Sequence, residues 1–588
     1  MRSRVERLVS VKAVYVVLVV SMSFVGIFPA GGAAFAKRAA ASAGAGDTPG
    51  GTRLAAAKNS GMSESENAAD SLEKSVAVSP TAGQATEDMT SYAADVKIDP
   101  ASKTATGSLH IRFAPRDPDY VYLHLYPLAF TEKKSGGLWL EILGKNAVPG
   151  TYHITKLVVQ GKPASYQIDG TVVKVGLGKA VSAKEGELQY AQASTQAGLQ
   201  ATAQATAQAT AQATAQATTQ PIDLELDFEM TLPLNMGRMS YDEHAIWLGN
   251  WLPVLAVYDA SGWHLDPYGP VGDPFYTETA NYQVQLTIPA GYQFVSTATD
   301  RNIAGKELQT GEITYSLQAK RVRDFSLVIM DNTYQHAETP VGNTWVRSWW
   351  RQGDSAGQVK RNHEAAVKAF AYFQAQFGAY PYPEYDTVRI GGNINGMEYP
   401  GIVFLDGSHY QCDHLSSIPT VVHETAHQWF YGLVGNNQVE EAWLDEGLAE
   451  YASLAFMVNA YPELAGEQVV GRMVRGTTGF YDKKGLKPWM ALSRFPDNES
   501  YSNLVYSRTT TMLWLLREAW GEQRLHAMLR RFVAAHQHGI ATGKGWVEAL
   551  TAEAGEDASL FIKYWLLLDR SQEQAAEAWL DRQRAAKR

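Results

Sequence analysis

Two histidines one helical turn apart are the first residues of the chain whose types and spacing could do chemistry. In PTVVHETAHQWFYGLVG, Pro419 can occupy the first turn of a helix and Gly435 can end it, so His423 and His427 share one face. Imidazoles at that spacing can bind one zinc ion. Glu424 is turned about 100° around the helix, which keeps it off the metal but near a water that the metal activates. The motif therefore predicts a zinc site with Glu424 as its catalytic base.

A third ligand is predicted in the next segment, because a pattern of five residues is only moderately specific. EEAWLDEGLAEY is typical of a second amphipathic helix, and it brings in Glu446 after eighteen intervening residues. Three protein ligands with one open position are what a catalytic zinc site needs. Glu450, one turn further on, could accept a hydrogen bond from a ligating histidine, or it could be a surface acid.

At this point the sequence resembles a known family. The HETAH helix followed at that spacing by WLDEG is similar to the aminopeptidase N and leukotriene hydrolase family of zinc metallopeptidases, which are gluzincins. In GGNINGMEYPGIVFL, residues Gly396, Met397 and Glu398 match the family's substrate loop, and Tyr399 stands where the family usually has Asn. The resemblance implies that Glu398 binds the free α-amino group of a peptide. A carboxylate in a water-poor cleft is a natural partner for an ammonium group.

A catalytic tyrosine is implied by a second matching segment, SYSNLVYSRTTTMLWLLRE. Tyr506 falls at the family's position, with Tyr501 five residues earlier, and its phenol could donate to the oxyanion of the tetrahedral intermediate. The other interpretation of Tyr506 is a tyrosine packed in a helix interface. In relatives the N-terminal domain adds a second polar group near the substrate amine. Glu243 and His244 are the candidates for it, and a structural role for both remains open.

The elements that must position these residues fall into two predicted domains. Residues 91–335 show apolar and polar residues in alternation, most clearly from Ile222 to Leu232, which predicts an antiparallel β domain. A low-complexity ATAQ repeat interrupts that domain at residues 190–221, and we expect it to be a surface insertion. Residues 340–588 follow a helical period, except for two short strands at DTVRI and GIVFL. The fold class predicted is multidomain: the β domain, then a mostly helical, thermolysin-like α+β catalytic domain.

The N-terminus predicts export. Arginines and a lysine precede an uncharged stretch from residue 13 to residue 36 that ends in Ala34-Phe35-Ala36, which is typical of a signal peptide covering residues 1–36. An uncleaved membrane anchor is the alternative. Residues 37–90 are poor in aromatics and predict a disordered tether. The protein is therefore expected to be secreted or associated with the cell surface, with no stable membrane insertion unless the N-terminal segment is uncleaved.

Composition excludes several classes of function. The formal net charge is −10 and no basic stripe appears, which argues against a nucleic-acid partner. The single cysteine, Cys412, rules out a disulfide within the chain and a cysteine-based zinc site. The sequence therefore favours an exported aminopeptidase that binds one Zn²⁺ per chain and acts on peptides. The alternatives are a zinc endopeptidase with an open cleft and a non-catalytic, zinc-stabilised surface protein that binds peptide ends.

Overall fold

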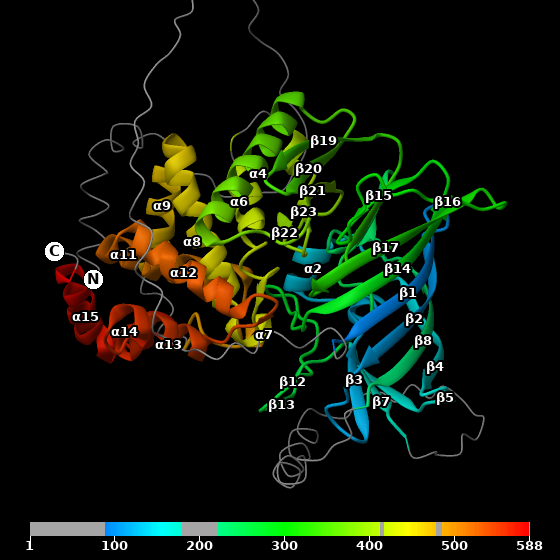
Figure 1. The fold of residues 1–588 in the computed structure, drawn as a ribbon, viewed down its shortest axis with the longest axis horizontal. Coiled ribbons are helices and arrows are strands. Elements are labelled where there is room, and N and C mark those ends of the chain that lie inside the picture. The colour runs from blue at the N-terminus through cyan, green and yellow to red at the C-terminus, as the bar shows by residue number, and fades with distance from the viewer. Residues whose placement is uncertain (1–88, 179–219, 412–414, 416, 478–484, 587–588) are drawn as a thin grey trace, which may run out of the picture. The chain divides into compact units, whose positions relative to one another are not determined.

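The computed structural model describes residues 89–178, 220–411, 415, 417–477 and 485–586 (Figure 1). The predicted signal peptide, nearly all of the predicted tether, all but the last two residues of the predicted insertion, and Cys412 lie outside the described residues. Among the helices that are described, none is both long enough and apolar enough to cross a membrane.

The N-terminal region is built on an eight-stranded sheet (Figure 1). Its strands, in spatial order, are β16 (Lys306–Glu307), β17 (Glu312–Val322), β14 (Ala280–Pro289), β1 (Ser91–Asp99), β2 (Thr104–Phe113), β8 (Ile222–Thr231), β4 (Thr151–Val159) and β5 (Lys162–Pro163). The inward-facing apolar residues of these strands are buried, as the alternation in β8 predicts. One pair departs from the expected antiparallel order, because β1 runs parallel to β14.

Smaller sheets complete this region. One contains β15 (Gln293–Ser296), β18 (Leu327–Met330), β10 (Ala245–Leu248) and β9 (Met239–Tyr241); another contains β11 (Val254–Leu255), β3 (Tyr120–His124), β7 (Val172–Gly176) and β6 (Tyr166–Asp169); β12 (Tyr258–Asp259) pairs with β13 (Gly262–Trp263). A short helix, α2 (Gly137–Leu143), and a 3₁₀ turn at Tyr126–Phe130 pack in the same region. Their buried apolar residues form one core with those of the eight-stranded sheet.

The C-terminal region begins with a five-stranded sheet and continues as helices. The sheet has the order β19 (Tyr334–Val341), β20 (Thr344–Arg351), β21 (Glu384–Ile390), β23 (Ile402–Asp406) and β22 (Gly396–Met397), so the strands expected at DTVRI and GIVFL are present. The helices are α4 (Ala356–Phe377), α5 (Ser408–Gln411), α6 (Ser417–Ala426), α7 (Gln438–Glu441), α8 (Trp443–Ala460), α9 (Pro462–Thr477), α10 (Asn498–Tyr501), α11 (Thr509–Trp520), α12 (Glu522–His536), α13 (Gly543–Ala554), α14 (Ser559–Leu566) and α15 (Glu573–Ala585). Between α10 and α11 lies a π-helix, Ser502–Arg508, and there are 3₁₀ turns at Leu492–Arg494 and Arg570–Gln572. The multidomain prediction, a β-rich region before a helical one, is confirmed.

Three local predictions for the C-terminal region are wrong. Residues 344–351, expected to follow a helical period, form the strand β20. The helix that carries the histidine motif ends at Ala426 and not at Gly435. The chain has to become extended by Val434, because β24 (Val434–Gly435) pairs with β25 (Gly539–Ile540). The helix α8 is not amphipathic, since every residue from Trp443 to Met457 is buried. It packs against α6, α9 and α11, so no side of it faces water over that length.

Candidate functional site

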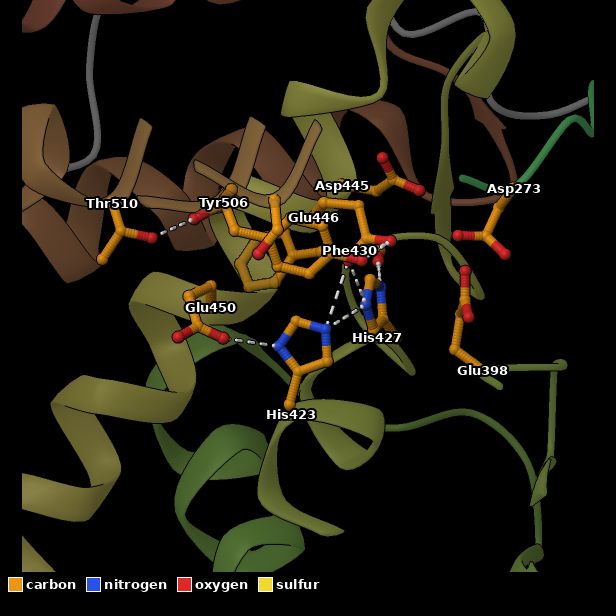
Figure 2. Close-up of polar contacts among 12 residues, drawn as sticks. Asp273, Glu398, His423, His427, Phe430, Asp445, Glu446, Glu450, Tyr506 and Thr510 are labelled. Carbon is orange, nitrogen blue, oxygen red and sulfur yellow. Dashed lines mark hydrogen bonds and ion pairs between the residues drawn. The ribbon is translucent and has the colours of Figure 1, made fainter. Parts of the chain in front are cut away.

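Three predicted ligands converge on one point. His423 Nε2 lies 3.0 Å from His427 Nε2 and 3.2 Å from Glu446 Oε2, and His427 Nε2 lies 3.1 Å from the same oxygen (Figure 2). The two histidines come from α6 and from the turn that follows it, and Glu446 comes from the first turn of α8. Ligands about 2.0 to 2.2 Å from a single zinc ion lie at comparable distances from one another. The two imidazole nitrogens and the carboxylate oxygen therefore form a donor set that fits one zinc ion.

The outer nitrogens of both histidines are held in place. His427 Nδ1 donates to the carbonyl oxygen of Phe430 at 2.9 Å, which makes Nε2 the free nitrogen. His423 Nδ1 lies 3.0 Å from Glu450 Oε2, and Arg472 Nε donates to the other oxygen of that carboxylate at 2.5 Å. Glu450 is buried, which excludes the surface role considered for it. These contacts orient both rings toward the point that they share with Glu446.

The charges of the ligands are matched to one another. Burial alone would lower the pKa of His423, but the carboxylates of Glu446 and Glu450 raise it to about 9. Burial would raise the pKa of Glu446, and the two histidines instead hold it well below its usual range. A metal cation takes the place of the protons on the imidazoles, because metal ligands must be deprotonated. The carboxylates that favour protonated imidazoles therefore also favour a metal cation at the point between the three side chains.

Glu424 lies beside this cluster without being part of it. Burial raises its pKa to about 8. Among the residues that the structure describes, its Oε2 has no hydrogen-bond partner. A side chain at Gly396 would overlap the Glu424 carboxyl group, so glycine at that position lets β22 pass close to it. An unpaired buried carboxyl group with a raised pKa is suited to accept and return a proton.

Glu398 lies next to the ligands within a group of buried acids. Glu398, Asp273 and Glu446 each offer an oxygen atom, and these three atoms lie within 4.8 Å of one another (Figure 2). Burial raises the pKa of both Glu398 and Asp273 to about 7. Gln438 Nε2 donates to Glu398 at 3.1 Å and to Asp445 at 2.7 Å. This corner of the site is therefore acidic, buried and only partly neutralised. Met397, which lies on β22 and directly precedes Glu398, is buried. Its Sδ atom accepts a hydrogen bond from Arg238 Nε at 3.0 Å.

Two residues of this corner were not predicted from the sequence. Asp273 comes from the loop before β14, and Arg238 pairs with it and also donates to Tyr268 Oη and to the Gly272 carbonyl, each at 3.0 Å. No local pattern marks either residue. The N-terminal candidates considered above lie elsewhere: the Glu243 side chain is 90% exposed, and His244 Nδ1 contacts Asp331 at 2.9 Å. Neither joins the buried acids, and Asp273 is the N-terminal residue that does.

Tyr506 lies on the π-helix, and its hydroxyl group donates to Glu446 Oε1 (Figure 2). Its ring lies over His423, with ring centroids 5.6 Å apart, and Tyr501 packs edge-on against it at 5.7 Å. A π-helix inserts an extra residue into a turn and frequently occurs at functional sites. The structure thus brings the phenol to the ligand cluster and not into a remote helix interface.

Tyr399 is accommodated by its neighbours in the N-terminal region. It is fully buried, and its hydroxyl group donates to Asn250 Oδ1 at 2.7 Å. A side chain at Gly249 would overlap the Tyr399 hydroxyl group. Glycine at 249 therefore provides the space that the larger side chain at 399 requires.

A buried arginine fixes the turn that follows His427. Arg323 is 1% exposed, and its guanidinium group donates to four backbone carbonyls. Nε donates to Tyr431 at 2.8 Å, and Nη1 donates to Thr277 at 3.0 Å. Nη2 donates to Leu433 and to Gly539. Tyr431 has a φ of 130°, a strained conformation for a residue other than glycine. Phe430, whose carbonyl orients His427, directly precedes Tyr431. Arg323 therefore helps to position His427, a predicted metal ligand, through the backbone.

Comparisons with known proteins agree with the family predicted from the sequence. Residues 361–565 match the model of the peptidase family M1 domain. Probable M1 family aminopeptidase 2 of Encephalitozoon cuniculi is 22% identical over 311 residues, which are 48% of this chain and 35% of the relative. Aminopeptidase M1-A of Oryza sativa is 28% identical over 40% of this chain and 28% of its own length. The chain therefore spans about a third of the length of these curated relatives.

A solved structure shows the same fold. A mutant of the M1 zinc metallopeptidase from Deinococcus radiodurans, bound to a Tyr-Ser-Ala substrate, superposes with a TM-score of 0.55 at 15% identity. The match covers 82% of this chain and 94% of that one, so it includes the β-rich region as well as the helical one. The resemblance predicted from the sequence is confirmed, because residues 361–565 match the peptidase family M1 domain and the curated relatives are named M1 family aminopeptidases.

Proposed function

We propose that the protein is an exported zinc aminopeptidase that removes N-terminal residues from peptides. One observation carries the proposal: three ligand atoms within 3.2 Å of one another lie directly beside a buried acidic corner that contains Glu398 and Asp273. The M1 domain and the zinc metallopeptidase fold support the zinc and the reaction class. Export rests on residues 1–36, which lie outside the described residues.

His423, His427 and Glu446 would hold the zinc ion, one per chain. When bound, zinc polarises the scissile carbonyl and lowers the pKa of water, which is the chemistry that peptide hydrolysis needs. The remaining functions fall to side chains of the protein. Glu424 takes the proton from the attacking water, because its carboxyl group is buried, unpaired at Oε2 and adjacent to the ligands. It then returns that proton to the leaving amine.

The acidic corner sets the position of the substrate. Burial and repulsion by neighbouring carboxylates raise the pKa values of Glu398 and Asp273, and a protonated amine between the two side chains would relieve both effects. A free α-amino group is therefore favoured there, and an acetylated one is not. Tyr506 donates from its hydroxyl group to the developing oxyanion at the scissile carbon. Together the corner and the ligands fix the cleaved bond as the first of the peptide.

The experiment that tests the proposal compares a free peptide with its N-acetylated twin, using the full chain loaded with zinc. We expect the free peptide to be cleaved at its first bond and the acetylated peptide to be cleaved at least a hundredfold more slowly. Glu398→Gln should reduce this difference, because it removes the charge that selects the amine. Asn437→Ala is a matched control, because Asn437 caps α7 close in sequence to Gln438 without belonging to the acidic corner.

Equal cleavage of both peptides would instead show an endopeptidase that uses the same zinc chemistry with Glu398 in a structural role. A non-catalytic protein that binds peptide ends is the second candidate. The unpaired oxygen of Glu424 argues against it, because a binding site gains nothing from an unsatisfied buried carboxyl group. Unchanged activity in Glu424→Gln with zinc still bound would remove the enzyme proposal altogether.

A further inference from the structure

A cavity lies outside the candidate metal site. Its volume is about 650 Å³. It is bordered by Ser316 and residues 318–322 of β17, by residues 297–299 and 381–384, and by His538. Pockets that bind small ligands or peptide side chains have volumes in this range. None of the bordering residues belongs to the ligand cluster or to the acidic corner. We call this space the β17 cavity.

One wall of the β17 cavity is a sheet edge that is only partly paired. On one side β17 pairs with β14 along its whole length, but on the other side β16 pairs only with Ile313 and Thr314. Beyond Thr314, none of the described strands pairs with that edge, and a loop residue, Thr299, reaches it at Gln318. In an antiparallel ladder, alternate residues turn their N–H and C=O groups to opposite neighbours.

The backbone contacts show which residues face the cavity. The Glu312 carbonyl accepts from Leu308 N at 2.8 Å, and the Gln318 carbonyl accepts from Thr299 N at 3.3 Å. Both residues therefore point their backbone groups to the open edge, and so does Ser316 between them. Ser316 presents an N–H donor and a C=O acceptor that an added strand could use.

The end of this edge is a strained bulge. The register between β14 and β17 shifts between Ala280 and Tyr282, which leaves an extra residue in β17. Arg321 has a φ of 57° there, a conformation that costs a residue other than glycine on the order of 1 kcal/mol or more. Tyr382 Oη donates to the Arg321 carbonyl at 2.6 Å, and His538 Nδ1 donates to it at 3.2 Å. Bulges change the direction of a side chain, and this bulge places Arg321, with its guanidinium group, in the wall of the cavity.

The charge of the β17 cavity is positive in a chain of net charge −10. Lys320 and Arg321 are both exposed at its wall, and the described part of the chain holds no salt bridge to either. The one carboxylate in the wall, Glu384, is 7% exposed and accepts from the backbone N–H groups of Asp300 and Arg301 and from the Arg347 guanidinium. The Glu384 carboxylate is therefore already hydrogen-bonded, and Lys320 and Arg321 are available to pair with a ligand.

We propose that the β17 cavity binds an extended peptide segment that carries acidic side chains. The peptide adds to the sheet next to Ser316, and a carboxylate pairs with Arg321 and Lys320. Backbone pairing supplies affinity in strand addition, and the pocket selects the side chain. This inference does not depend on the proposed peptidase activity, because no metal ligand takes part in it.

The test uses a probe blocked at both ends, Ac-Val-Glu-Val-Glu-Val-NH₂, titrated into the full chain by calorimetry. It has no free amine for the acidic corner, so its binding is independent of the proposed function. We expect one peptide per chain and at least tenfold weaker binding of Ac-Val-Lys-Val-Lys-Val-NH₂. Ac-Glu-NH₂ should fail to displace the probe, because it cannot form a strand. Displacement by Ac-Glu-NH₂ at similar concentration would show a simple anion site and overturn the proposal.

A charge variant tests the role of the bulge. Arg321→Asn removes the guanidinium group but keeps a residue that tolerates positive φ, so the bulge should be retained. We expect binding at least tenfold weaker and an unchanged melting temperature. Lys162→Asn, which removes a positive charge at the opposite edge of the same sheet, is the matched control and should bind the probe like the wild type. Equal binding by Arg321→Asn and the wild type would overturn the proposal.

A backbone variant tests the strand pairing. Ser316→Pro removes the N–H group that faces the cavity and breaks no hydrogen bond to β14, whereas Ser316→Ala keeps that N–H group. We expect at least tenfold weaker binding for proline and unchanged binding for alanine. Hydrogen exchange at the Ser316 amide of the wild type supplies a measurement that does not depend on the folding of the proline variant. The probe should slow that exchange, and an unaffected amide would overturn the proposal.

Discussion

The structure contains two buried groups of carboxylates that differ in how their oxygen atoms are used. In the first, which we call the Arg347 cluster, Arg347 donates from Nη2 to Asp300 at 2.6 Å, to Glu384 at 3.0 Å and to Asp386 at 2.7 Å. Backbone N–H groups, Ser296 and Trp349 satisfy the remaining oxygens. The second is the acidic corner with the adjoining Glu424, where an oxygen has no partner and three ligand atoms converge.

Both groups show raised pKa values, so a shifted pKa does not by itself identify a functional site. Burial raises the pKa of Asp300 and of Asp386 to about 6, and it raises that of Glu398 to about 7. The useful difference lies in the carboxylate oxygens: those of the Arg347 cluster all accept hydrogen bonds, although Arg347 Nε has no partner among the described residues, whereas Glu424 leaves a carboxylate oxygen for a ligand. The comparison predicts that variants of the first group change stability and that variants of the second change activity.

The largest effect is expected at Glu424. Glu424→Gln should lower kcat/KM by about a thousandfold, because the amide cannot accept the proton from water. Zinc content and melting temperature should stay close to those of the wild type, since Glu424 is not a ligand. Steady-state kinetics with a free peptide, together with metal analysis of the same preparation, checks both statements. A lost zinc ion would place Glu424 among the ligands and contradict the assignment.

The Arg347 cluster should respond in the opposite way. Arg347→Met leaves three buried carboxylates without their cation, and we expect the free energy of unfolding to fall by about 3 to 5 kcal/mol at pH 7. The kcat of the protein that remains folded should not change. Urea unfolding at pH 7 and at pH 4 measures the loss, which should be smaller at pH 4 because protonated carboxyl groups no longer need the arginine. A loss that grows toward pH 4 would contradict this account.

A smaller effect is expected at Arg323, which connects the N-terminal region to the turn that follows α6 in the C-terminal region. Arg323→Met removes the donors to four backbone carbonyls and releases the strained turn at Tyr431. Because that turn orients His427 through Phe430, we expect zinc to bind about 10- to 100-fold more weakly. Competition with a chelating dye measures the affinity without any substrate. Arg530→Met, which also loses hydrogen bonds to backbone carbonyls but lies on α12 away from the turn, is the control.

The smallest effect is the pH dependence of the Arg347 cluster in the wild type. Folding raises the pKa of Asp300 and Asp386 above the unfolded value, so the folded state binds more protons between about pH 4 and pH 6. The stability from these two groups is therefore fully present below pH 4 and is lost as the pH rises through 6, by up to about 1.4 kcal/mol per pH unit and group. Asp300→Asn should flatten the curve of unfolding free energy against pH. An unchanged slope would show that Asp300 stays ionised throughout this range.

The sequence allowed prediction where function depends on local spacing. His423 and Glu424 lie on α6 and His427 directly follows its last residue, so the motif depends on local spacing. The alternation in β8 and β14 places the apolar residues of each strand on one face. Asp273, Arg238 and Arg323 could not be predicted, because their partners are up to 216 residues away and the contacts depend on how the two regions pack. The end of α6 was misjudged for the same reason, since the pairing of β24 with β25 overrides a local helix signal. The roles assigned to the site residues stay predictions until the variants are measured.

The contact between Tyr399 and Gly249 has an evolutionary consequence. The hydroxyl group of Tyr399 occupies the space that any side chain at 249 would need. A smaller side chain at 399, such as asparagine, would leave that space free for a side chain at 249. The two positions are therefore expected to show epistasis. In a library that varies both, Gly249→Ala should be selected against beside tyrosine and tolerated beside asparagine.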